Sequence, residues 1–146
     1  MKKRISILLV LTLLLTMPAA SAGCVHVTQT LIEFQDADAV FTLDYDLDFL
    51  AKIYVMAFGS AKIVPEIEAR FVSFDEDNVT IEQLDYERAV VIVKNVSHYN
   101  DGYYFHNSHD FGITMEKLVL DPPDGSPRVY LNTNSTPSLF YADVWD

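Results

Sequence analysis

One alternating segment early in the chain restricts the fold more than any other feature. From residue 41 to residue 49, every odd position holds an aromatic or aliphatic side chain, and the even positions hold Thr42, Asp44, Asp46 and Asp48. A helix would spread these two sets around its circumference, whereas a strand sends successive side chains to opposite faces of a sheet. The segment therefore predicts a half-buried β-strand with its odd positions in the core.

Further strands are predicted by short apolar or β-branched runs separated by turn residues. The runs cover residues 25–34, 67–71, 79–84, 89–93, 113–120, 128–132 and 139–145, and turn signals recur at intervals of roughly 8–12 residues. In the 67–71 run, Ile67, Ala69 and Phe71 alternate with charged neighbours. Seven or eight such strands predict a mostly β fold, an immunoglobulin-like antiparallel β-sandwich that forms a single domain over residues 23–146.

One short helix is expected over residues 49–58. Phe49, Ile53 and Met56 have helical spacing, Asp48 can serve as the N-cap, and Gly59 can end the helix. We expect these apolar side chains to pack into the core. A continued strand is the alternative.

The N-terminus has the features of a secretory signal peptide. Lys2, Lys3 and Arg4 precede an apolar block from Ile5 to Leu15, and small residues lead up to Ala22. This block is short for a membrane span, so we expect a signal peptide over residues 1–22, cleavage after Ala22, and an extracellular or cell-surface location. A retained membrane anchor is the alternative.

Cys24 is the single cysteine and has three possible states. The segment from Ser21 to Cys24 resembles a lipoprotein processing box in which serine replaces the usual leading leucine. Lipidation of Cys24 would attach the mature domain to a membrane. A disulfide between two chains and a free thiol are the other two states.

The charge balance limits the partners. The chain has 10 Lys and Arg against 21 Asp and Glu, and removal of residues 1–22 takes away three positive charges and no negative one, which leaves a net charge near −14. Nucleic acid is excluded as a partner because its phosphates require a basic surface. An acidic exterior suits a divalent cation or a cationic partner, and it also keeps a protein soluble.

Three sequons are present, at Asn78, Asn95 and Asn134. In an exported chain, they predict glycosylation at surface sites. The acidic, sequon-bearing and cysteine-poor composition is similar to that of archaeal envelope proteins, and no motif in the chain defines a family.

Residues 98–111 hold three of the four histidines and raise the possibility of a metal site. The candidate ligands are His98, His106, His109 and Asp110. A two-residue loop at Asp101-Gly102 would place His98 and His106 on opposite faces of a hairpin, whereas a three-residue loop would place them on one face. The alternative is that these histidines pack among the neighbouring aromatic rings.

Calcium is the second metal considered. Asp44, Asp46 and Asp48 lie on a strand, where their carboxylates are too far apart to share an ion unaided. The turns are better candidates because a bent backbone can add carbonyl ligands. The candidate ligands there are Asp75, Asp77, Asp121 and Asp124.

No sequence motif indicates catalysis. The chain has no G-x-S-x-G, no H-E-x-x-H, no phosphate-binding loop and no dinucleotide-binding glycine pattern. The leading hypothesis is a secreted or cell-surface β-sandwich protein without a cofactor or catalytic activity, with a structural or protein-interaction role in which it binds a cell-envelope or surface protein. The first alternative is a module that binds a divalent cation, or a carbohydrate through exposed aromatic rings. The second alternative is a small secreted hydrolase.

Overall fold

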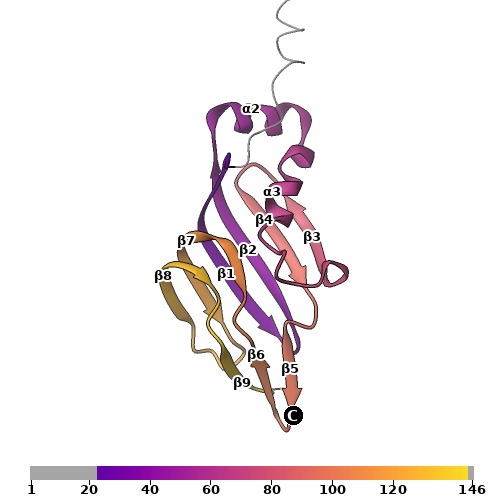
Figure 1. Cartoon of the computed structure of the whole chain (residues 1–146), viewed down its shortest axis with the longest axis vertical. Helices are drawn as coiled ribbons and strands as arrows, with labels where there is room; N and C mark the ends of the chain where they lie inside the picture. The colour runs from indigo at the N-terminus through magenta and orange to yellow at the C-terminus, as the bar shows by residue number, and fades with distance from the viewer. Residues whose placement is uncertain (1–22, 145–146) are drawn as a thin grey trace, which may run out of the picture.

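The computed structural model describes residues 23–144, and this part of the chain is mostly β (Figure 1). The expected signal peptide, its cleavage site at Ala22, and Trp145 lie outside the described residues. The strands are β1 Val25–Gln35, β2 Asp38–Leu47, β3 Val79–Leu84, β4 Arg88–Val93, β5 Ser97–Asn100, β6 Tyr103–His106, β7 Asp110–Asp121, β8 Arg128–Ser135 and β9 Leu139–Ala142. The α-helices are α2 Phe49–Phe58 and α3 Val64–Glu68, and 3-10 turns cover Ser60–Lys62 and Glu76–Asn78.

The strands form two sheets. The larger sheet has six strands in the order β3-β4-β2-β1-β7-β8, and the smaller has three in the order β5-β6-β9. The pairs are antiparallel except β1 with β7, in which Gln29 to Glu33 run parallel to Lys117 to Asp121. The expectation of an entirely antiparallel arrangement is therefore wrong at this pair, because β7 enters beside β1 after a long crossover through the small sheet.

The core lies on one face of the large sheet. Along β2, Phe41, Leu43 and Tyr45 are buried, and the even positions between them are half-buried, which confirms the alternation seen in the sequence. The small sheet covers one end of this face, where the Phe34 ring lies 5.0 Å from that of His106 and 5.1 Å from that of Tyr141. The segment around α3 covers the other end.

The α3 segment corrects one expected strand. Residues 67–71 were expected to form a strand, but the chain forms the helix α3 up to Glu68, with Pro65 in its first turn, where proline is well tolerated, and residues 69–71 continue in turns. Ile63, Ile67 and Phe71 are all buried, at a spacing of four residues. Apolar residues spaced by four lie on one face of a strand and also on one side of a helix. In the observed structure this side packs in the core, where the Phe71 ring lies 5.3 Å from that of Phe41.

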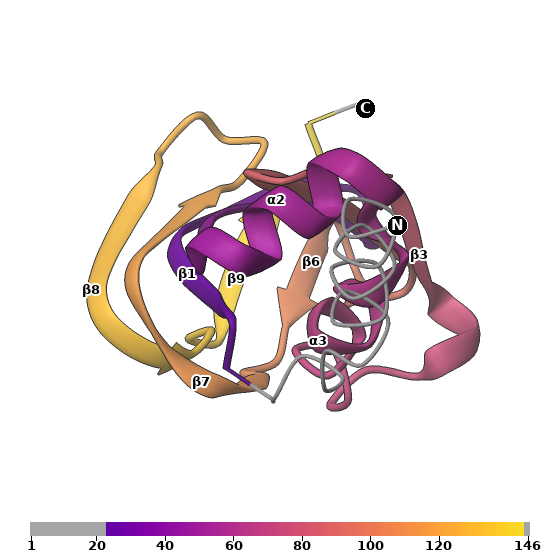
Figure 2. The same cartoon turned by 90° about the horizontal axis from the view of Figure 1, so that it is seen from above.

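The helix expected over residues 49–58 is confirmed as α2, but its expected burial is wrong. Val55 is its only buried residue, whereas Phe49 is 76% exposed and Met56 is 67% exposed. Figure 1 shows α2 lying crosswise at one end of the long axis of the molecule, and Figure 2 shows it from above. Within residues 23–144, we find no helix that combines the length and the apolar character needed to cross a bilayer.

Candidate functional site

The β5–β6 hairpin determines where the histidines point. Asp101 and Gly102 form a two-residue loop with φ values of 48° and 85°, the positive values that a type I′ hairpin turn requires. Asn100 therefore pairs with Tyr103, and His98 pairs with Phe105. With this register, His98 and His106 face opposite sides of the small sheet.

His106 is buried between the two sheets, and both of its ring nitrogens are used. Nδ1 lies 3.1 Å from the Val96 carbonyl oxygen, and Nε2 lies 3.0 Å from the Thr136 hydroxyl. Burial lowers the pKa of His106 to about 4, so the ring is neutral. A neutral ring that donates from Nδ1 to the carbonyl must accept at Nε2 from Thr136, whose oxygen in turn accepts from the His109 backbone N–H at 2.8 Å. This network ties β6 to the chain before β9.

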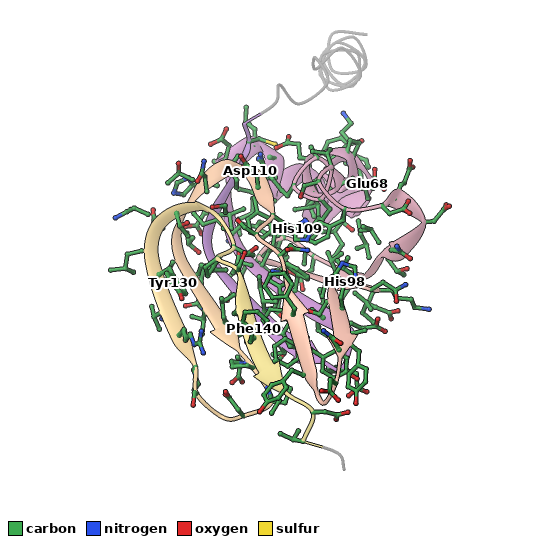
Figure 3. All side chains as sticks on the ribbon, turned by 60° about the horizontal axis from the view of Figure 1, so that its bottom comes forward. Glu68, His98, His109, Asp110, Tyr130 and Phe140 are labelled. Atoms are coloured by element: carbon green, nitrogen blue, oxygen red, sulfur yellow. The ribbon has the colours of Figure 1, made fainter. Side chains whose placement is uncertain are left out.

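Two of the four predicted metal ligands lie close together, since the ring centroids of His106 and His109 are 5.4 Å apart, but the four do not form one group. The His109 ring stacks on Phe74, with centroids 4.1 Å apart, and burial lowers the pKa of His109. Asp110 accepts a hydrogen bond from the Gly112 N–H at 2.7 Å, and His98 comes from β5, on the face of the small sheet opposite to His106 (Figure 3). No group of three or more His, Cys, Asp or Glu residues that could hold a metal ion exists among residues 23–144. His106 and His109 therefore pack among aromatic rings, whereas His98 is exposed, and metal binding stays a prediction.

The expected calcium ligands are also dispersed. Asp75 and Asp77 lie at the turn before β3, whereas Asp121 ends β7 and Asp124 lies in the turn that follows. Asp124 accepts a hydrogen bond from the Ser126 N–H at 2.9 Å, which is a local turn contact. The two turns are separate candidates, no group of three or more His, Cys, Asp or Glu residues forms at either one among the described residues, and calcium binding stays a prediction.

The sequons and Cys24 have contrasting environments. Asn95 and Asn134 are exposed and Asn78 is half-buried, and glycosylation at these positions stays a prediction.

Cys24 is buried, and its thiol donates to Glu66 Oε1 at 2.8 Å. Burial, followed by the Glu66 carboxylate, raises the pKa of Cys24 to about 11. Lipidation of Cys24 also stays a prediction, and it would require the sulfur to leave this contact.

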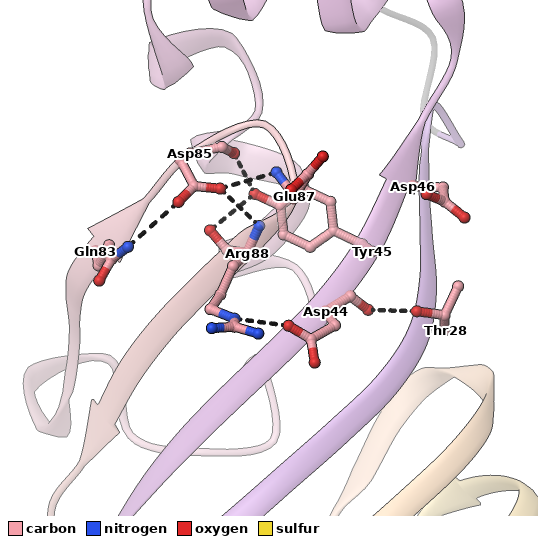
Figure 4. A pocket seen from close by; sticks show the side chains of 8 residues that line it. All are labelled: Thr28, Asp44, Tyr45, Asp46, Gln83, Asp85, Glu87 and Arg88. Atoms are coloured by element: carbon pink, nitrogen blue, oxygen red, sulfur yellow. Dashed lines mark hydrogen bonds and ion pairs between the residues drawn. The ribbon is translucent and has the colours of Figure 1, made fainter.

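A polar pocket of about 380 Å³ lies where the β3–β4 turn meets β2 (Figure 4). Asp85 accepts hydrogen bonds from the backbone N–H groups of Glu87 and Arg88, both at 2.8 Å. Its own carbonyl accepts from the Tyr45 hydroxyl at 2.6 Å, and the Arg88 guanidinium donates to Asp44 at 2.7 Å. The polar groups of the pocket hydrogen-bond with one another. We therefore interpret these contacts as stabilising the β3–β4 turn.

A larger groove of about 1070 Å³ runs between the α3 segment and the edge strand β3. Its apolar lining includes Phe71, Phe74 and Ile81, and its lining carboxylates are Glu68, Asp75, Glu76 and Glu82. No lysine or arginine lines it. The sequence analysis missed this groove because it exists only if residues 64–68 form a helix; the four-residue spacing of Ile63, Ile67 and Phe71 was the available signal.

The outer face of the small sheet exposes aromatic rings. Phe105 and Phe140 are cross-strand neighbours with ring centroids 4.5 Å apart, and Phe140 is 64% exposed. Tyr103 is exposed on the same face, whereas Tyr141 points into the core. The aromatic hairpin is thus partly core and partly surface, and Figure 1 shows the small sheet at the end of the molecule opposite α2.

Comparisons of the chain with protein-family models, curated proteins and solved structures gave no significant match.

Proposed function

We propose that the chain is an exported, cell-surface domain of β-sandwich type that binds another protein and performs no catalysis. The observation that carries this proposal is the groove along β3, which combines an unpaired sheet edge, an apolar floor and an acidic rim. Such a site suits an extended segment of a partner, which can add to the sheet edge through its backbone and place alternate side chains in the groove.

The edge itself is available within the part of the chain that the structure describes. β3 pairs with β4 on one side only, and its last carbonyl, that of Leu84, accepts a hydrogen bond from Ser60 at 2.9 Å. That bond fastens the loop after α2 to the end of the strand and leaves the earlier residues of β3 facing the groove. Unpaired edge strands are ready templates for pairing with a second chain.

The rim selects the charge of the partner. Glu68 and Glu82 lie on opposite walls of the groove, from the α3 segment and from β3. A segment with lysine or arginine side chains would be attracted to both walls, and a segment with acidic side chains would be repelled. We therefore propose a basic, extended segment of a cell-envelope or surface protein as the ligand.

Photo-crosslinking on cells tests this proposal. Benzoylphenylalanine at Val72, an exposed residue of the groove lining, should give an adduct with a partner protein, whereas the same reagent at the exposed Val129 of β8 should not. Reversal of two rim charges, Glu76→Lys with Glu82→Lys, should reduce the adduct by about tenfold or more.

The matched control is Glu116→Lys, which reverses an exposed charge on β7, away from the groove lining. It should leave the adduct unchanged. The proposal fails if the Val129 reagent captures the same partner, or if rim reversal and the β7 control have equal effects.

Carbohydrate binding is the second candidate, and the exposed rings of Phe140 and Tyr103 favour it. Exposed aromatic rings can stack on sugar rings, but the 4.5 Å contact between Phe140 and Phe105 leaves part of each ring covered. Glycan-array binding that is lost in Phe140→Ala would support this function. Binding that persists in Phe140→Ala, or no binding at all, would count against it.

A further inference from the structure

The most apolar side of α2 faces solvent. At 100° per residue, Phe49, Leu50, Ile53, Met56 and Ala57 fall within one arc of the helix, and all five are exposed. Val55 and Ala51, on the opposite side, are the residues that contact the core. A helix of a soluble domain normally has the reverse arrangement, with its apolar stripe on the core.

This exposed arc, called here the apolar stripe of α2, lies at the end of the domain where the described residues begin. The backbone N–H of Asp48, just before α2, donates to the Cys24 carbonyl oxygen at 3.2 Å, so the helix begins beside the first described residues. Residues 1–22, which include the apolar block from Ile5 to Leu15, connect at Gly23. A retained anchor or an acyl chain on Cys24 would each hold this end of the domain at a membrane.

The orientation of α2 also suits a flat surface. Figure 1 shows the helix lying across the long axis of the molecule at its tip, with the β5–β6 hairpin and β9 at the far end. A surface that touched the whole stripe would leave the long axis pointing away from it. The charged residue within α2, Lys52, lies beside the stripe and contacts Glu87 at 3.4 Å, so the stripe itself contains no charge.

We propose that α2 lies in the surface of a lipid bilayer, with the side chains of Phe49, Ile53 and Met56 in the boundary between head groups and acyl chains. Interfacial helices lie parallel to the membrane and place their apolar side about 5–10 Å into this boundary. The free energy of membrane binding would come from burial of the apolar surface of α2, because an acidic domain is not attracted to anionic lipid. This inference is independent of the groove and its partner.

A site-specific fluorescent label tests the inference in the full chain. In a Cys24→Ser background, the environment-sensitive label NBD is attached at Ile53→Cys, and the protein is reconstituted with phosphatidylcholine vesicles. The label should shift its emission to shorter wavelength and be quenched by lipids that carry a nitroxide on the acyl chain. The same label at Val129→Cys, an exposed position of β8, is the matched control and should keep the emission it has in water.

A second variant separates α2 from any anchoring by residues 1–22. With Phe49→Ser and Met56→Ser added, quenching at position 53 should fall by about tenfold or more, whether or not residues 1–22 bind the vesicles. Because both side chains are exposed, these changes should leave the circular dichroism spectrum unchanged.

Two results would overturn the inference. One is a label at position 53 that stays in a water-like environment while the chain is bound to vesicles. The other is a concentration-dependent shift at position 53 without vesicles, which would show that the stripe is covered by a second copy of the chain.

Discussion

His106 is a buried polar side chain that makes two hydrogen bonds within the apolar core. Its neutral ring joins the Val96 carbonyl to the Thr136 hydroxyl, and protonation would force a second N–H against a hydroxyl that already donates to the ring. The residue therefore stabilises the packing of the two sheets only while it is neutral.

The stability of the protein should fall in mild acid because of His106. Its pKa is lowered from 6.5 to about 4, so the unfolded state binds more protons than the folded state between these values. Stability is then complete above about pH 6.5 and decreases by about 3 kcal/mol as the pH falls to 4. Urea denaturation of the wild type and of His106→Gln over this range measures the effect.

His106→Gln should be less stable than the wild type at pH 7. The difference between their free energies of unfolding should become smaller as the pH falls, because the variant lacks the group that is protonated. His109, whose pKa is also lowered, is present in both proteins, but its ring lies 5.4 Å from that of His106, so the comparison reports the two coupled residues together. A difference between the two proteins that stays constant from pH 7 to 4 would contradict the role given to His106.

The segment from α2 to α3 places apolar side chains in two very different environments. Ile67 of α3 is 0% exposed and packs in the core, whereas Ile53 of α2 is 49% exposed. The two helices lie close in the chain and differ in what covers them. The same residue type therefore offers a direct comparison of their roles.

Truncation of these two isoleucines should have unequal costs. Ile67→Ala should lower the free energy of unfolding by about 2–5 kcal/mol, because it leaves a cavity in the core. Ile53→Ala should change it by less than about 0.5 kcal/mol, because its side chain is half in water and alanine favours helix. Chemical denaturation of both variants checks this, and equal losses would show that α2 is packed in solution.

At the scale of the whole molecule, an apolar interior is enclosed by a strongly acidic surface. Residues 23–146 carry a net charge near −14, and the structure shows two ion pairs of Lys or Arg among the described residues, Lys52 with Glu87 and Arg88 with Asp44. Most carboxylates therefore repel one another across the surface. This repulsion opposes folding at low ionic strength.

Added salt should stabilise the protein. Raising NaCl from about 0.01 M to 1 M shortens the screening length from about 30 Å to 3 Å and should raise the free energy of unfolding by about 1 kcal/mol. Thermal unfolding at several salt concentrations measures the effect. The gain should shrink near pH 4, where carboxylates begin to be protonated, and a gain that is equal at both pH values would point to a cause other than charge.

The elements that depend on local pattern could be predicted from the sequence. The alternation along β2 and the helical spacing within α2 can be recognised from neighbouring residues, because backbone geometry alone determines which side chains share a face of a strand or helix. The Asp101-Gly102 turn was one of two loops that the sequence allowed, and the positive φ values of both residues decided between them.

What the tertiary structure decided is which partner each face meets. The Ile63, Ile67 and Phe71 residues fit a strand and a helix almost equally well, and only the contact with Phe41 selects the helix and opens the groove along β3. The apolar stripe of α2 looked like a core face, yet no other element lies over it within residues 23–144. Local sequence defines which sides of an element are apolar, but the long-range packing of other elements determines which of those sides are removed from water.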